Sequence, residues 1–134
     1  GKTLTDGALT EGTYRLQGAI VGVTQEENRL YHVNNARLTL ANSSASFEGV
    51  TMMVNHLIED NEVEAPEELP MQFNGSFTTT SEGGISITGA GEYEMHGFYT
   101  GAGNQIFLVI SDSTGPEMKT GLLLATLIEE SPEP

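Results

Sequence analysis

Hydrophobic and polar residues alternate with a period of two along most of the chain, and no segment keeps a repeat of 3.6 residues. In 71–78, for example, Met71, Phe73 and Phe77 fall on one face and polar residues on the other. This alternation is typical of a β-strand with one buried face. It predicts strands at about 12–23, 28–34, 36–41, 45–55, 71–80, 84–92, 94–100, 105–111 and 118–128.

The connectors between these segments predict antiparallel neighbours. Asn42-Ser43-Ser44, Ser81-Glu82-Gly83-Gly84 and the glycine-rich segment 100–104 are short and have hairpin chemistry. A β-bulge at Asn34-Asn35 would merge 28–34 with 36–41 into one strand. Glycines within several strands permit strong coiling. We therefore expect an all-β fold: a single antiparallel meander of about eight strands that closes into a small barrel.

The one long connector, 56–70, holds six acidic residues in fifteen. We expect it on the surface as an acidic loop, with room for a turn or two of helix after Pro66. Its oxygen-bearing side chains suit calcium, although their spacing does not match a known calcium loop. A solvated acidic loop and a calcium site both stay open; the side chains are Glu59, Asp60, Asn61, Glu62 and Glu64.

The chain of 134 residues has room for one domain. We expect an N-terminal arm at 1–11, the barrel at 12–128 and a flexible acidic tail at 129–134. Gly12-Thr13-Tyr14 at the first strand resembles the Gly-x-Trp opening of the lipocalin and streptavidin group, with Tyr14 in place of the tryptophan. Segment 97–109 resembles the strand–turn–strand rhythm of exported bacterial β-domains. Both resemblances imply a fold, and neither carries over a site.

Five Lys and Arg stand against nineteen Asp and Glu, a net charge of −14. This balance argues against binding to nucleic acid or to anionic lipid, because both need a basic surface. The longest apolar run, 121–128, is too short for a membrane-spanning helix. The absence of cysteine excludes disulfides and thiol chemistry, and no phosphate-loop or other cofactor motif occurs. A removed signal peptide would fit the start at Gly1, so we expect an extracytoplasmic location.

The apolar face of the sheet offers a possible ligand site. In a barrel of eight strands the interior is either filled by side chains or leaves a cavity for one small ligand. Both interpretations stay open, and we expect a non-enzymatic binding module for a small hydrophobic ligand or a protein partner. The expected ligand-binding residues are Tyr14, Met53, Met71, Phe73, Tyr93, Met95 and Tyr99.

Segment 92–99 carries a second possible site. Glu92, Glu94 and His96 share one face and would supply acid and base groups if that face pointed inward. The alternative is that Met95 and Tyr99 face the core and the charged row faces water. We favour this alternative, since charged side chains are rarely interior without partners.

Segments 106–110 and 118–128 are apolar on both faces, so something must cover their outer side. The candidates are the connector 56–70, the N-terminal arm around 4–9, or a second subunit. The last candidate makes a structural, self-associating domain the alternative to a ligand carrier.

Overall fold

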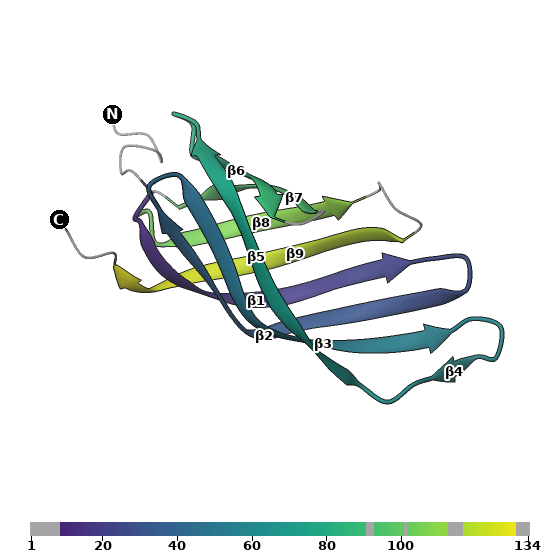
Figure 1. Ribbon diagram of the computed structural model, residues 1–134. Coiled ribbons are helices and arrows are strands. Elements are labelled where there is room, and N and C mark those ends of the chain that lie inside the picture. Colours follow the sequence, from purple (N-terminus) through teal and green to yellow (C-terminus); the bar gives the residue numbers. More distant parts are fainter. Residues whose placement is uncertain (1–8, 91–92, 101, 113–116, 131–134) are drawn as a thin grey trace.

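The computed structural model describes residues 9–90, 93–100, 102–112 and 117–130; for residues 90, 93 and 112 it describes the backbone alone. The described residues form strands and turns, with no helix among them. The nine strands (Figure 1) are β1 Gly12–Val23, β2 Glu27–Ala41, β3 Ser44–Leu57, β4 Glu62–Val63, β5 Glu67–Thr79, β6 Gly84–Ala90, β7 Tyr93–Tyr99, β8 Gln105–Asp112 and β9 Met118–Glu130.

Every neighbouring pair of strands is antiparallel. The sheet runs in the order β2-β1-β9-β8-β7-β6-β5-β3-β4, and the pairing of β2 with β3 closes it. Eight strands therefore form a closed barrel, with the two-residue β4 as an addition on β3. The predicted all-β antiparallel barrel is confirmed.

The hairpin between β2 and β3 shows why the local sequence folds in this way. Asn42 and Ser43 both have positive φ, at 51° and 67°, between the paired residues Ala41 and Ser44. Two positive φ values in a two-residue loop match the twist of the flanking strands. Asparagine tolerates this conformation well, so the turn and the strand register agree.

The bulge predicted at Asn34-Asn35 is present and makes β2 one continuous strand. Val33 pairs with Thr51, whereas Asn35 pairs with Val50, so the register shifts by one residue. Val33 and Ala36 are both buried, although residues i and i+3 of a regular strand face opposite sides. In β2, the inward residues therefore have odd numbers before the bulge and even numbers after it.

Gly49 lies opposite this bulge and permits the bend. Its φ is 137°, and a Cβ there would lie 2.4 Å from the carbonyl oxygen of Asn35. Only glycine tolerates this combination of backbone angle and close approach.

The connector 56–70 differs from the expected loop with helix. Asn61 takes a φ of 50° in a tight turn that brings β4 back onto His56 and Leu57 of β3. β5 then begins at Glu67, earlier than predicted, because Leu69 continues the inward alternation of Met71. A strand after Pro66 extends the sheet by pairing with β3, whereas a helix there would make none of these inter-strand hydrogen bonds. Residues 59–68 are exposed, as expected.

The core is continuous but differs between the two ends of the barrel. At the end that holds Tyr14, Leu40 and Ile106, which we call the closed end, inward side chains are apolar and fully buried. The phenol of Tyr14 donates to the carbonyl oxygens of Thr10 and of Gly103, the latter at 3.1 Å. At the end that holds Gly22, Arg29 and Lys119, which we call the open end, the inward side chains include polar and charged ones, several of them partly exposed.

Candidate functional site

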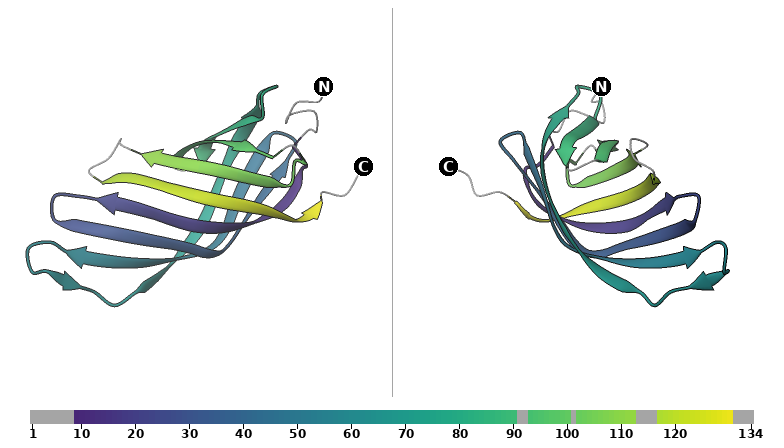
Figure 2. Two further views of the ribbon diagram at one scale, coloured as in Figure 1. Left: turned by 180° about the vertical axis from the view of Figure 1, so that it is seen from behind. Right: turned by 45° about the vertical axis from the view of Figure 1, so that its right-hand side comes forward.

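The open end exists because the strands differ in length. β5 pairs with β6 only along Ser76–Thr79, whereas it pairs with β3 along ten residues. For 67–75, no described strand pairs on the other side of β5. Pro70 lies in this unpaired stretch, where its missing N–H costs no ladder hydrogen bond. β1, β2, β3 and β9 extend beyond the short β6–β7 hairpin and form a trough (Figure 2).

A cavity of about 210 Å³ lies inside the barrel next to this opening. Five strands contribute to it, so the site depends on the barrel and not on one loop. Most of the lining is apolar, and a hydroxyl, a phenol and an ammonium group add polar contacts. The lining residues are Ile20, Tyr31, Thr51, Leu69, Pro70, Met71, Phe73 and Lys119.

Glu117 is the centre of a polar network beside the cavity. Its carboxylate accepts hydrogen bonds from Arg29 Nη1 at 3.3 Å and from the Tyr31 hydroxyl at 3.0 Å. Lys119 Nζ lies 3.3 Å from its other oxygen. Arg29 also donates to Glu27 Oε2 from Nε at 3.0 Å and from Nη2 at 2.7 Å. Two carboxylates thus balance two cations.

Gly22 makes the space that this network occupies. A Cβ at position 22 would lie 2.3 Å from Glu117 Oε2, so any larger residue would displace the carboxylate. Gly22 pairs with Arg29 on one side and with Lys119 on the other. The backbone therefore places both cations next to Glu117.

The network shifts the pKa values of Glu27, Arg29 and Tyr31. The hydrogen bond from Arg29 lowers the pKa of Glu27, and the same bond raises the pKa of Arg29. Burial and the hydrogen bond to Glu117 raise the pKa of Tyr31. Lys119 Nζ also lies 5.8 Å from the centre of the Tyr31 ring, within cation–π range. The edge of the cavity is thus a set of fixed, mutually compensating charges.

Asn55 is a buried amide with one unsatisfied atom. It pairs with Arg29 across the sheet, and its Nδ2 donates to Glu64 Oε1 at 2.7 Å. Its Oδ1 is buried and accepts no hydrogen bond. Buried acceptors are normally satisfied by the protein or by water. Asn55 therefore offers an acceptor at the open end.

The structure brings two of the expected ligand-binding residues, Met71 and Phe73, into the cavity. Met53 is half-buried at an inward position of β3, opposite Tyr31. The remaining described ones lie in the core: Tyr14 is fully buried, and Met95 and Tyr99 are 2% and 7% exposed. The side chain of Tyr93 lies outside the described residues.

Sequence reasoning missed the other lining residues, above all Tyr31 and Lys119. The signal was present as polar side chains at every second position, Glu27, Arg29 and Tyr31 in one strand. Their direction could not be read from the pattern, because the bulge places them on the same side as Leu38 and Leu40 despite their odd numbers. Polar side chains at these positions point toward the interior and are partly exposed at its open end.

The row Glu94 and His96 lies on the outside of β7. Both side chains are exposed, whereas Met95 is buried. His96 Nδ1 lies 3.1 Å from the Ser86 hydroxyl on the neighbouring strand. Glu92 lies outside the described residues. The described part of this row therefore faces water, as the favoured interpretation expected, and does not reach the interior.

The acidic connector makes local contacts at its tip. Asn61 Oδ1 lies 3.0 Å from His56 Nε2, and Glu64 contacts Asn55. Within the described residues, no three His, Asp or Glu side chains are placed to hold a metal ion.

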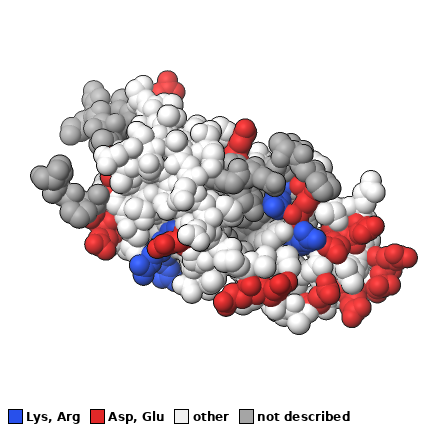
Figure 3. Space-filling model, viewed as in Figure 1, with Lys and Arg blue, Asp and Glu red and all other residues white. Residues whose placement is uncertain are grey.

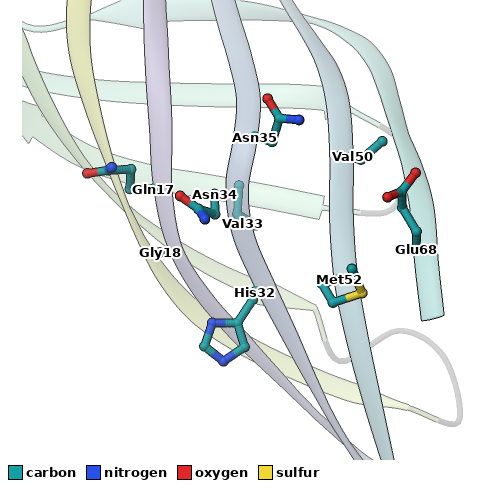
Figure 4. Close-up of a pocket in the computed structure, with 9 residues that line it drawn as sticks. All are labelled: Gln17, Gly18, His32, Val33, Asn34, Asn35, Val50, Met52 and Glu68. Carbon is teal, nitrogen blue, oxygen red and sulfur yellow. The ribbon is translucent and has the colours of Figure 1, made fainter. Parts of the chain in front are cut away.

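A second hollow, of about 630 Å³, lies on the outer surface of β1, β2, β3 and β5. Figure 4 shows its lining residues around the bulge, among them Gln17, His32, Asn34 and Glu68. Their side chains spread over the sheet surface and do not enclose a space. Small-molecule sites are usually concave and mainly apolar, so the inner cavity is the better candidate.

Comparison with protein-family models, curated proteins and solved structures found no match to this chain. Among the described residues, no helix is long and apolar enough to cross a membrane. The functional argument therefore rests on the site itself.

Proposed function

We propose that this barrel is a non-enzymatic binding module for a small, neutral, mainly apolar molecule, held in the cavity at the open end. The observation that carries the proposal is the inward cavity of about 210 Å³, which has apolar walls and a polar edge. Sites for small ligands usually combine an apolar lining with a few fixed polar groups. Here Thr51, Tyr31 and Lys119 supply those groups.

The cavity volume limits the size of the ligand. An apolar cavity of roughly 150 Å³ holds benzene, so a cavity of about 210 Å³ suits a single ring with one substituent or a short aliphatic chain. Ligands of this size bind weakly, because each atom contributes a limited free energy. We therefore expect dissociation constants in the millimolar range for model compounds.

The charge of the ligand follows from the surroundings of the cavity. Exposed carboxylates gather at the end of the molecule where β3 and β4 lie (Figure 3). The cations beside the cavity are already balanced by Glu27 and Glu117. The net field therefore repels anions and favours neutral molecules.

The methionines provide a direct test by NMR of methyl-labelled protein. Met71 lines the cavity, Met95 is buried in the core, and Met52 and Met118 are 40% and 62% exposed on the outside. Titration with benzyl alcohol should shift the Met71 methyl signal and leave the other three in place. Benzoate, which has a similar shape but carries a charge, should bind more weakly at low salt.

A matched pair of variants separates the cavity from the surface. Thr51→Leu fills the cavity and should abolish the Met71 shift, whereas Thr88→Leu, at an exposed position of β6, should retain it. Shifts confined to Met52 or Met118, or no shift up to the solubility limit of benzyl alcohol, would refute the proposal.

A further inference from the structure

Apolar side chains gather on the outward face of β7, β8 and β9. Phe98, Val109 and Leu122 are 58%, 51% and 57% exposed. Phe107 and Leu124, beside them, are half-buried, and the rings of Phe98 and Phe107 stack with centroids 5.2 Å apart. We call these five residues the outer apolar face. They are adjacent across the sheet, since Phe98 pairs with Phe107, Phe107 with Leu124, and Val109 with Leu122.

The outer apolar face lies in a part of the surface that carries few charges and is bordered by Glu94 on β7 and Arg15 on β1. The described outward positions of β8 and β9, from Gln105 to Ser111 and from Met118 to Ile128, include no charged residue. The rest of the chain is strongly acidic, with a net charge of −14. Figure 2, left, shows β8 and β9 on the near side of the molecule, away from β4.

The connector 56–70 does not cover this face. Its β4 pairs with His56 and Leu57 of β3, and β5 pairs with β3 and β6. The connector 56–70 is therefore excluded as the segment that covers β8 and β9. The N-terminal arm up to residue 8 lies outside the described residues.

We infer that a second copy of this chain packs on the outer apolar face. Two copies that each carry −14 repel one another at every acidic surface, so this sparsely charged face is where they can meet with the fewest opposed carboxylates. A cationic partner would instead select the acidic end. An exposed apolar patch of a few hundred Å² is often functional.

The size and symmetry of the face suit a two-fold dimer. Its three most exposed side chains leave on the order of 300 Å² uncovered. The neighbouring uncharged residues Ala19, Val21 and Thr120 extend it toward the roughly 800 Å² that each partner contributes to a stable interface. A two-fold axis that passes near Val109 and Leu122 would place this face against its own copy.

Sedimentation equilibrium of the full chain tests this inference. The wild type should be a dimer, and Leu122→Lys and Val109→Lys should each be monomers with unchanged circular dichroism, because each buries a charge in the interface. The matched control Val63→Lys changes a side chain that is 63% exposed on β4, and should remain a dimer. Added salt should tighten the wild-type dimer, since it screens the repulsion between acidic copies.

The absence of native cysteine gives a second readout. Leu122→Cys should form a disulfide-linked dimer on mild oxidation, and Val63→Cys should not. A monomeric wild type would overturn the inference. So would a monomer whose Leu122→Cys thiol is shielded from a maleimide reagent, since the chain's own arm would then be the cover. Binding of a monomer to uncharged phosphatidylcholine vesicles, lost in Leu122→Lys, would assign the face to lipid and equally overturn it.

Discussion

The two ends of the barrel are built from the same strands but differ in what their inward side chains do. At the closed end, Tyr14, Leu38 and Phe47 are fully buried and apart from one phenol make no polar contact. At the open end, Arg29, Tyr31 and Glu117 point into the same interior and bond to one another. The closed end supplies most of the burial that stabilises the fold, and this leaves the open end available for a site.

The difference also shows how one sheet accommodates both roles. β6 and β7 are seven residues each, whereas β2 has fifteen and β3 fourteen. The longer strands continue past the shorter ones. Part of their inward face therefore has no strand opposite it. Side chains on that face stay partly hydrated, so polar residues are tolerated there.

The largest expected effect comes from truncating the closed end. Phe47→Ala should lower the free energy of unfolding by about 3–5 kcal/mol, because a fully buried ring leaves a cavity. Phe73→Ala, on the neighbouring strand and half-buried beside the existing cavity, should cost about 1 kcal/mol. Urea denaturation measures both. Equal losses would show that the cavity does not reduce the contribution of Phe73, which pairs directly with Phe47.

Removing the phenol of Tyr14 should have the next largest effect. Tyr14→Phe loses the hydrogen bonds to Thr10 and Gly103 and should cost about 1–2 kcal/mol at neutral pH. Burial raises the pKa of Tyr14 from 10.0 to about 12. The folded state therefore holds this proton more tightly, so its contribution is complete below pH 10 and is lost as the pH rises to about 12.

Denaturation at a series of alkaline pH values tests that sign. The wild type should lose stability over this range more steeply than Tyr14→Phe. Part of the loss should persist in the variant, because the pKa of Tyr31 is raised as well. A variant with the same slope as the wild type would contradict the assignment to Tyr14.

At the open end, Glu117→Gln should have a moderate effect. It leaves Arg29 and Lys119 without their shared carboxylate and should cost about 1–2 kcal/mol, since charged hydrogen bonds of partly buried groups are stronger than neutral ones. Glu82→Gln, at an exposed turn, is the matched control and should change stability little. Thermal unfolding compares them. A loss as large as that of Phe47→Ala would contradict the division between the two ends.

Sequence patterns predicted the closed end well. The alternation in 36–41, 45–55 and 84–92 predicted strands with one buried face, and Leu38, Leu40, Phe47 and Ile87 are buried in them; turn chemistry at Asn42-Ser43 joined the first two of these strands correctly. These features depend on neighbours in sequence, so they are visible in the chain. The doubly apolar β8 and β9 were likewise visible, and their outer side chains are exposed.

The open end was less visible because it depends on distant contacts. Tyr31 and Glu117 are 86 positions apart, and no local pattern indicates their hydrogen bond. The strand start at Glu67 was hidden by its acidic neighbours, which suggested a loop with helix. The bulge was predicted, but its effect on which side Arg29 faces requires the pairing of β2 with both neighbours.

The smallest expected effect concerns the titration of Glu27. The hydrogen bond from Arg29 lowers the pKa of Glu27 below 4.5, so its contribution to stability is present above that pH and is lost as the pH falls through the lower folded value. Arg29→Gln should raise the Glu27 pKa toward the ordinary value, as followed by carboxyl carbon NMR. Arg37→Gln, on the outside of the same strand, should leave it unchanged.

The extra residue in β2 has a consequence for how this chain tolerates insertion and loss. Asn34 and Asn35 both face outward between the inward Val33 and Ala36, so deleting Asn34 would leave a regular alternation in which Arg29 and Tyr31 still face inward. The loss would remove the local bend opposite Gly49 and keep the lining of the trough. The interior of the barrel is thus insulated from a one-codon deletion that would reshape its outer wall.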